Sequence, residues 1–192
     1  MSKTKVKKII LKTTDVTLAI LVFPIMLSTI LLASLIILIL EFQSPIFLQK
    51  RVGMRGKAFL IFKLRTMKAQ QVDLPTHLVS ASEVTKFGRF LRKYKIDEFP
   101  QIFNVLLGDM SFVGPRPCLL SQTELIKCRS EYGLLDVLPG ITGIAQVNGI
   151  DMSDPRRLAS AEGNFYSSLD LSTYFLTIFA TFSKRSLSDR LR

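Results

Sequence analysis

A long run of apolar residues near the start dominates the hydrophobic pattern of this chain. Residues 16–40, VTLAILVFPIMLSTILLASLIILIL, carry no charged side chain, and Glu41 ends the run. The lysines that precede it are Lys3, Lys5, Lys7, Lys8 and Lys12. The length matches a transmembrane helix. A cleaved signal peptide fits poorly, because the run is too long and no small-residue cleavage site follows it. The run alone favours a single span with the lysines in the cytoplasm.

Pro24 suggests an alternative to a single transmembrane span. Proline removes a helical hydrogen bond and kinks the helix, and Ser28 and Thr29 follow one turn later. A single span would place residues 41–192 outside, although they still carry 21 lysines and arginines. A bend at Pro24 would instead return the chain to the face from which it entered, and would keep this basic region in the cytoplasm.

Shorter patterns after residue 41 predict a hairpin and a helix. Two apolar runs separated by Gly53 and Gly56 predict paired strands within residues 42–68. Residues 69–84 are polar and predict a loop. Aromatic and apolar positions at helical spacing predict a helix over residues 85–95, with cations on its other side.

A second helix is predicted over residues 97–107. Asp97 suits its N-cap, Pro100 is tolerated in the first turn, and Gly108 suits its end. Residues 108–117, GDMSFVGPRP, predict a rigid loop in which two prolines flank Arg116.

The C-terminal part adds a glycine-rich turn and one more apolar segment. The turn lies at residues 139–149, PGITGIAQVNG. Residues 171–182 are apolar and aromatic, and a basic tail follows them. Such a segment suits attachment at a membrane interface or, equally, an ordinary core helix. The patterns together predict an α/β fold that is mostly helical with a small β portion.

Composition narrows the functional classes. The 192 residues include 26 lysines and arginines against 15 acids, for a net charge of +11, and the mean hydropathy is +0.32. A chain both basic and apolar suggests a membrane surface and anionic ligands. Cys118 and Cys128 lack metal or redox spacing and are expected to be reduced packing residues. The single histidine, His77, argues against histidine-based catalysis or metal binding.

The adjacent acids Asp97 and Glu98 are the candidate catalytic residues. They follow the cations of residues 86–95, and a helix cap with a first-turn acid is the structural alternative. A carboxylate can attack phosphorus covalently, and phosphoryl transfer also needs a divalent ion and cationic groups. Glu98, Arg92 and Arg116 are candidates for these supporting roles. Nearby cations should lower both carboxyl pKa values.

At these residues the chain resembles the bacterial sugar transferases, the small monotopic polyprenyl-phosphate phosphoglycosyl transferases. The matching blocks are SPIFLQKRVGMRGKAFLIFKLRTM at 44–67, TKFGRFLRKYKIDEFPQIFNVLLGDMSFVGPRP at 85–117, PGITGIAQVNG at 139–149 and the hydrophobic segment with Pro24. The resemblance implies a compact catalytic domain over residues 42–192, cytoplasmic and membrane-associated, with interfacial amphipathic helices. Residues 1–41 would form a re-entrant helix–break–helix bent at Pro24, on the bacterial inner membrane.

The resemblance also implies a reaction. Asp97 would attack a UDP-sugar, UMP would leave, and polyprenyl phosphate would then take the sugar phosphate from the enzyme. Glu98 would help to hold Mg2+, and Arg92 and Arg116 would contact phosphate. Lys63 and Arg65 would help to shape the anionic site.

Three departures from the family pattern define the alternatives. Phe23 stands where the family commonly has serine before the proline, and Ile150 stands where an arginine often follows the Asn-Gly of the third block. The segment after residue 150 also matches poorly. A catalytically inactive relative is therefore one alternative. A membrane-anchored module that binds anionic lipid or nucleic acid is another, but the acid pair would repel a polyanion, so no nucleic acid is expected. The sugar and the oligomeric state, a homodimer included, stay open.

Overall fold

The computed structural model describes residues 3–68 and 83–183 and is mostly helical, with two small sheets. Most of the predicted polar loop at 69–84 lies outside the described residues, as do His77 and the basic tail. The helical character and the small β portion predicted from the sequence are confirmed.

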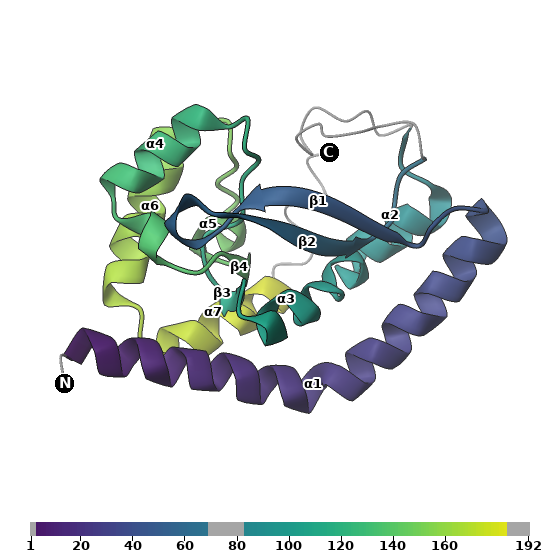
Figure 1. Cartoon of the computed structure of the whole chain (residues 1–192), viewed down its shortest axis with the longest axis horizontal. Helices are drawn as coiled ribbons and strands as arrows, with labels where there is room; N and C mark the ends of the chain where they lie inside the picture. Colours follow the sequence, from purple (N-terminus) through teal and green to yellow (C-terminus); the bar gives the residue numbers. More distant parts are fainter. Residues whose placement is uncertain (1–2, 69–82, 184–192) are drawn as a thin grey trace.

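Helix α1 (Lys3–Glu41) contains the whole apolar run in 39 residues. It stays helical through Pro24, so the predicted break is a bend within one continuous helix. Figure 1 shows α1 changing direction near its middle, where proline removes a hydrogen bond. The Ser28 hydroxyl donates to the Pro24 carbonyl and the Thr29 hydroxyl to the Ile25 carbonyl, each at 2.9 Å. Such back-bonding is common where helices bend.

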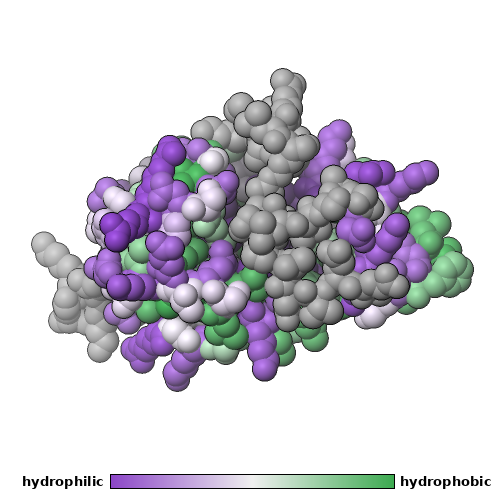
Figure 2. All heavy atoms as spheres, turned by 90° about the horizontal axis from the view of Figure 1, so that it is seen from above, coloured by the Kyte–Doolittle hydropathy of each residue, from purple (hydrophilic) through white to green (hydrophobic). Residues whose placement is uncertain are grey.

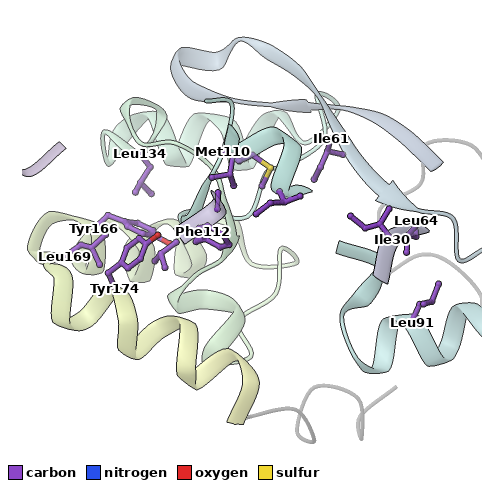
Figure 3. Packing of buried hydrophobic residues seen from close by; sticks show 14 of the residues in the cluster. Ile30, Ile61, Leu64, Leu91, Met110, Phe112, Leu134, Tyr166, Leu169 and Tyr174 are labelled. Atoms are coloured by element: carbon purple, nitrogen blue, oxygen red, sulfur yellow. The ribbon is translucent and has the colours of Figure 1, made fainter. Parts of the chain in front are cut away.

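One side of α1 belongs to the hydrophobic core. Ala19, Ile30, Ala33 and Ile37 are buried in the main cluster, and Figure 3 shows Ile30 near Leu64 of the hairpin. The other side is exposed and apolar. α1 is the one helix in the described part of the chain that is long and apolar enough to cross a membrane.

Asp15 fastens α1 to the core and was not singled out from the sequence. Its side chain is 4% exposed. One oxygen, Oδ1, accepts from the Ser111 hydroxyl at 2.9 Å, the Phe112 amide at 2.8 Å and the Tyr174 hydroxyl at 2.6 Å. A buried carboxylate needs such partners. This contact joins α1 to two segments far away in sequence.

The predicted hairpin is confirmed. β1 (Ile46–Val52) pairs antiparallel with β2 (Ala58–Leu64), with Phe47 opposite Lys63 and Gln49 opposite Ile61. The short helix η1 (Met54–Gly56) forms the turn. Because side chains alternate along a strand, Gln49, Arg51 and Lys63 share one face of the hairpin.

The prediction of one helix starting at Asp97 is wrong. The observed elements are α2 (Lys86–Lys93), η4 (Ile96–Glu98) and α3 (Gln101–Leu107). Thr85 is the N-cap of α2, which lies within the helix predicted over residues 85–95, and Gly108 ends α3 with φ 85°. Between them, Lys95 adopts a left-handed conformation with φ 56°, which turns the chain into η4. Pro100 is the N-cap of α3, so Asp97 caps no helix.

The remaining elements share the main core with α1 and the hairpin. β3 (Ser111–Val113) pairs in parallel with β4 (Gly140–Thr142). The helices around this small sheet are α4 (Thr123–Glu131), η5 (Leu134–Asp136), α5 (Ile144–Val147), α6 (Pro155–Ser168) and α7 (Leu171–Ser183). Cys118 and Cys128 are buried and free, as predicted.

Helix α7, predicted from the apolar C-terminal segment, has a buried side and an exposed apolar side. Tyr174 is fully buried, whereas Leu176 is 62% and Phe179 68% exposed. In Figure 1, α7 lies beside α1. The opposite face of the molecule, viewed in Figure 2, is largely hydrophilic where its residues are described. The molecule therefore has an apolar side, formed by α1 and α7, and a polar side.

Candidate active site

The acid pair lies on η4, between the hairpin and the loop after β3. Glu98 is 13% exposed, and its Oε1 atom accepts both Lys63 Nζ at 3.2 Å and Arg116 Nη2 at 3.3 Å. One cation comes from β2 and the other from the predicted rigid loop. The tertiary fold therefore brings together Lys63, Arg116 and the acid pair, which the family resemblance assigns to one site.

Asn104 sets the distance between η4 and the hairpin. Its side-chain amide donates to the Leu60 carbonyl at 2.7 Å and accepts from the Phe62 amide at 3.1 Å. It thus replaces a neighbouring strand along the open edge of β2. Because α3 follows η4 directly, this contact holds Glu98 within reach of Lys63.

The two carboxyl groups have opposite pKa shifts. Burial acts to raise the pKa of Glu98, but the charges of Lys63 and Arg116 outweigh it and lower this pKa to about 2. Burial, and then the charge of Glu98, raise the pKa of Asp97 to about 6 against the effect of the nearby cations. The prediction that both values would fall is therefore wrong for Asp97, because burial and its acidic neighbour dominate there.

Arg92 lies near the pair, but Arg65 makes its contacts elsewhere. Arg92 Nε donates to the Thr66 hydroxyl at 2.9 Å, and its charge acts on Asp97. Arg65 Nε donates to the Ser44 carbonyl at 2.8 Å, and its guanidinium lies 5.9 Å from the centre of the Phe47 ring. These contacts are at the open end of the hairpin, so the structure does not bring Arg65 to the acid pair.

Arg51 belongs to the site, although it was not singled out from the sequence. It lines a small open pocket together with Lys63, Glu98 and Arg116. Its Nε and Nη2 atoms donate to Gln49 Oε1 at 3.1 and 2.6 Å. The sequence does hold a signal for Arg51. Residues two apart on a strand share a face, so Gln49 and Arg51 lie on the face that the hairpin register shares with Lys63.

The loop that carries Arg116 is fixed by close backbone packing. Gly114 donates its amide to the Thr142 carbonyl at 2.9 Å. A Cβ atom on Gly114 or Gly140 would collide with the backbone of the facing segment. The glycines of two separate sequence blocks are therefore required by the same contact, which places Arg116 beside Glu98.

The acid pair fits a divalent metal only as part of a larger ligand set. Among the residues that the structure describes, no three His, Cys, Asp or Glu side chains are grouped for a metal. Mg2+ is commonly held by one or two carboxylates together with substrate phosphates. Asp97 and Glu98 provide carboxylates of this kind, and the cations around them suit a diphosphate.

These features define a membrane-associated protein with a cluster of cations around a pair of adjacent carboxyl groups. The sequence pattern of the bacterial sugar transferases matches residues 6–186. The chain therefore belongs to the bacterial sugar transferase family.

Similar proteins include an uncharacterized sugar transferase, EpsL, of Bacillus subtilis, 42% identical over 123 residues, which are 64% of this chain and 60% of that protein. A UDP-glucose:undecaprenyl-phosphate glucose-1-phosphate transferase of Klebsiella pneumoniae is 38% identical over 154 residues, 73% of this chain and 33% of that protein. One of the same name from Caulobacter vibrioides is 41% identical over 143 residues, 71% and 52% respectively. The chain thus spans between a third and three fifths of the length of these relatives.

Proposed function

We propose that this protein transfers sugar 1-phosphate from a UDP-sugar to a polyprenyl phosphate such as undecaprenyl phosphate. UMP would be released, and a polyprenyl diphosphate sugar would form. The observation that carries the proposal is the arrangement at η4, where a half-buried carboxyl group, Asp97, stands next to a Glu98 that is paired with two cations. The names of the relatives support the same reaction class.

Asp97 is the nucleophile in this proposal. A bond forms between its carboxylate oxygen and the phosphorus that bears the sugar, and the bond from that phosphorus to the UMP oxygen breaks. An oxygen of polyprenyl phosphate then attacks the same phosphorus and releases Asp97. A pKa of about 6 supports this role, because the group is mostly ionised at pH 7 and is more basic than an ordinary aspartate.

The cations around Asp97 have distinct roles. Lys63 and Arg116 hold Glu98 ionised, and with Arg51 and Arg92 they attract the diphosphate of the donor. Glu98 would help to hold Mg2+, which would supply further neutralisation of charge on the reacting phosphate. Arg65 has the weakest case, given its contacts with Ser44 and Phe47.

The membrane arrangement follows from the two sides of the molecule. The bend of α1 at Pro24 and the exposed apolar sides of α1 and α7 support a re-entrant helix and an interfacial helix. We propose that they embed in the inner membrane from its cytoplasmic face. A site at this interface would be reached by a soluble nucleotide and by a lipid phosphate.

The test is UMP release by protein purified in detergent or nanodiscs, with Mg2+, undecaprenyl phosphate and a panel of UDP-sugars that includes UDP-glucose and UDP-galactose. Asp97→Asn should abolish release while the protein stays folded. The control is Asp136→Asn, which removes an exposed acid on η5 and should leave the rate unchanged. Without the lipid acceptor, mass spectrometry of the wild-type protein should detect one sugar phosphate added to it, absent in Asp97→Asn.

Two outcomes would reject the proposal. Asp97→Asn with the wild-type rate would exclude Asp97 as the nucleophile. A folded wild-type protein that releases no UMP from any donor would favour the inactive relative.

A further inference from the structure

The loop that carries Arg116 is held by hydrogen bonds to four successive carbonyl groups. The carbonyls of Pro115, Arg116, Pro117 and Cys118 each accept from a different residue. The donors are, in order, the Gly140 amide at 2.9 Å, Arg129 Nη1 at 2.8 Å, Arg51 Nη1 at 3.2 Å and the Val52 amide at 3.0 Å. The two prolines have no N–H to contribute, so outside donors fix this segment.

Unlike Arg51, Arg129 does not line the pocket beside Glu98. It lies on α4 and forms a bidentate ion pair with Glu162 of α6. Nε donates to Oε2 at 2.9 Å, and Nη2 donates to Oε1 at 2.8 Å. The side chains are only 5% and 1% exposed. Two guanidinium nitrogens are therefore taken by Glu162, and the third is directed at the Arg116 carbonyl.

Stability alone does not explain this pair. Burying two charges carries a large desolvation cost, and apolar residues of similar volume often serve equally well or better. A guanidinium held by a carboxylate, however, has a fixed orientation and can place its remaining N–H groups accurately. What this pair places is the backbone of the residue whose side chain contacts Glu98 at 3.3 Å.

We infer that Arg129 and Glu162 form a positioning pair that holds the Arg116 backbone, and so the Arg116 guanidinium, in place at the active site. The inference rests on the proposed function. Neither residue lines the pocket beside Glu98, so they act through Arg116 and not on the substrate. A pair with only a structural role would stabilise the packing of α4 on α6 and would have no effect on Arg116.

The double variant Arg129→Met with Glu162→Leu separates these roles. It removes both charges together, so that neither is left buried and unpaired, and it removes the donor to the Arg116 carbonyl. We expect a melting temperature close to the wild type, but faster hydrogen exchange at the Arg116 and Cys118 amides. The kcat/KM for UMP release should fall on the order of 10- to 100-fold, as for small displacements of catalytic groups. Lys127→Met, at an exposed position of α4, is the control and should change none of these.

The inference would be overturned if the double variant has the melting temperature, the amide hydrogen exchange and the kcat/KM of the wild type. If that variant does not fold, Arg129→Lys provides the test instead. Lysine keeps the positive charge beside Glu162 but cannot bind both carboxylate oxygens and the Arg116 carbonyl together. Folded Arg129→Lys with wild-type exchange and kinetics would also overturn it. If the wild-type protein releases no UMP from any donor, the proposed function fails, and amide exchange at Arg116 and Cys118 still tests the positioning role.

Discussion

Replacing the proposed nucleophile should make the protein more stable while it removes activity. The pKa of Asp97 is about 6 in the folded protein, against an ordinary value of 3.8. The folded state therefore binds this proton more tightly than the unfolded chain. Ionising the group costs stability as the pH rises from about 4 through about 6. The difference of about two pKa units corresponds to about 3 kcal/mol at pH 7. An asparagine side chain carries no charge, so Asp97→Asn should recover most of this cost.

The assay is thermal unfolding in one detergent at several pH values. For a chain of this size, about 3 kcal/mol corresponds to a rise in melting temperature of roughly 6 to 12 °C. The gain should be full above pH 7 and should disappear below pH 4, where Asp97 is protonated in both states. Asp170→Asn is the control with the opposite sign, because hydrogen bonds from Thr173 lower the pKa of this exposed group. If Asp97→Asn is no more stable than the wild type at pH 7.5, or if its gain in stability does not depend on pH, the raised pKa of Asp97 is refuted.

Three further measurements test other parts of the structure. The kcat/KM for UMP release should decrease below about pH 6, with the slope of one proton, as Asp97 becomes protonated; a profile flat to pH 5 would contradict this. Asp15→Ala leaves two buried donors, the Phe112 amide and the Tyr174 hydroxyl, without their acceptor, and should lower the free energy of unfolding by about 2 kcal/mol or more in denaturant titrations; a loss below about 1 kcal/mol would show that Asp15 does not hold α1 on the core. Arg116→Gln should reduce kcat/KM far more than Arg65→Gln, since Arg116 alone of the two contacts Glu98, and equal losses would show that the open end of the hairpin also binds substrate.

Local patterns were sufficient for much of the fold. The hairpin follows from apolar runs around Gly53 and Gly56, and the end of α3 follows from Gly108. The start of α3 could not be predicted in the same way. It depends on Lys95 in a left-handed conformation, which is uncommon for a residue other than glycine and has no strong sequence signal.

The grouping of residues at the candidate site was predictable only in part. The motif around Asp97 singled out the acid pair, and the structure places the proline-flanked Arg116 in contact with Glu98. The raised pKa of Asp97 depends on burial by distant segments, which spacing along the chain does not reveal. The same holds for Arg129 and Glu162, which are 33 residues apart and meet only through the packing of α4 on α6.

The sharing of one core between α1 and the rest of the molecule has a consequence for how the protein is made. Ala19, Ile30 and Ile37 complete the core from one side of the helix whose other side is apolar and exposed. In water, that exposed side would favour aggregation. In a membrane without the remaining chain, the buried Asp15 would lack its partners. Insertion and folding are therefore coupled, and a version that begins after residue 41 should fail to complete its core even in detergent.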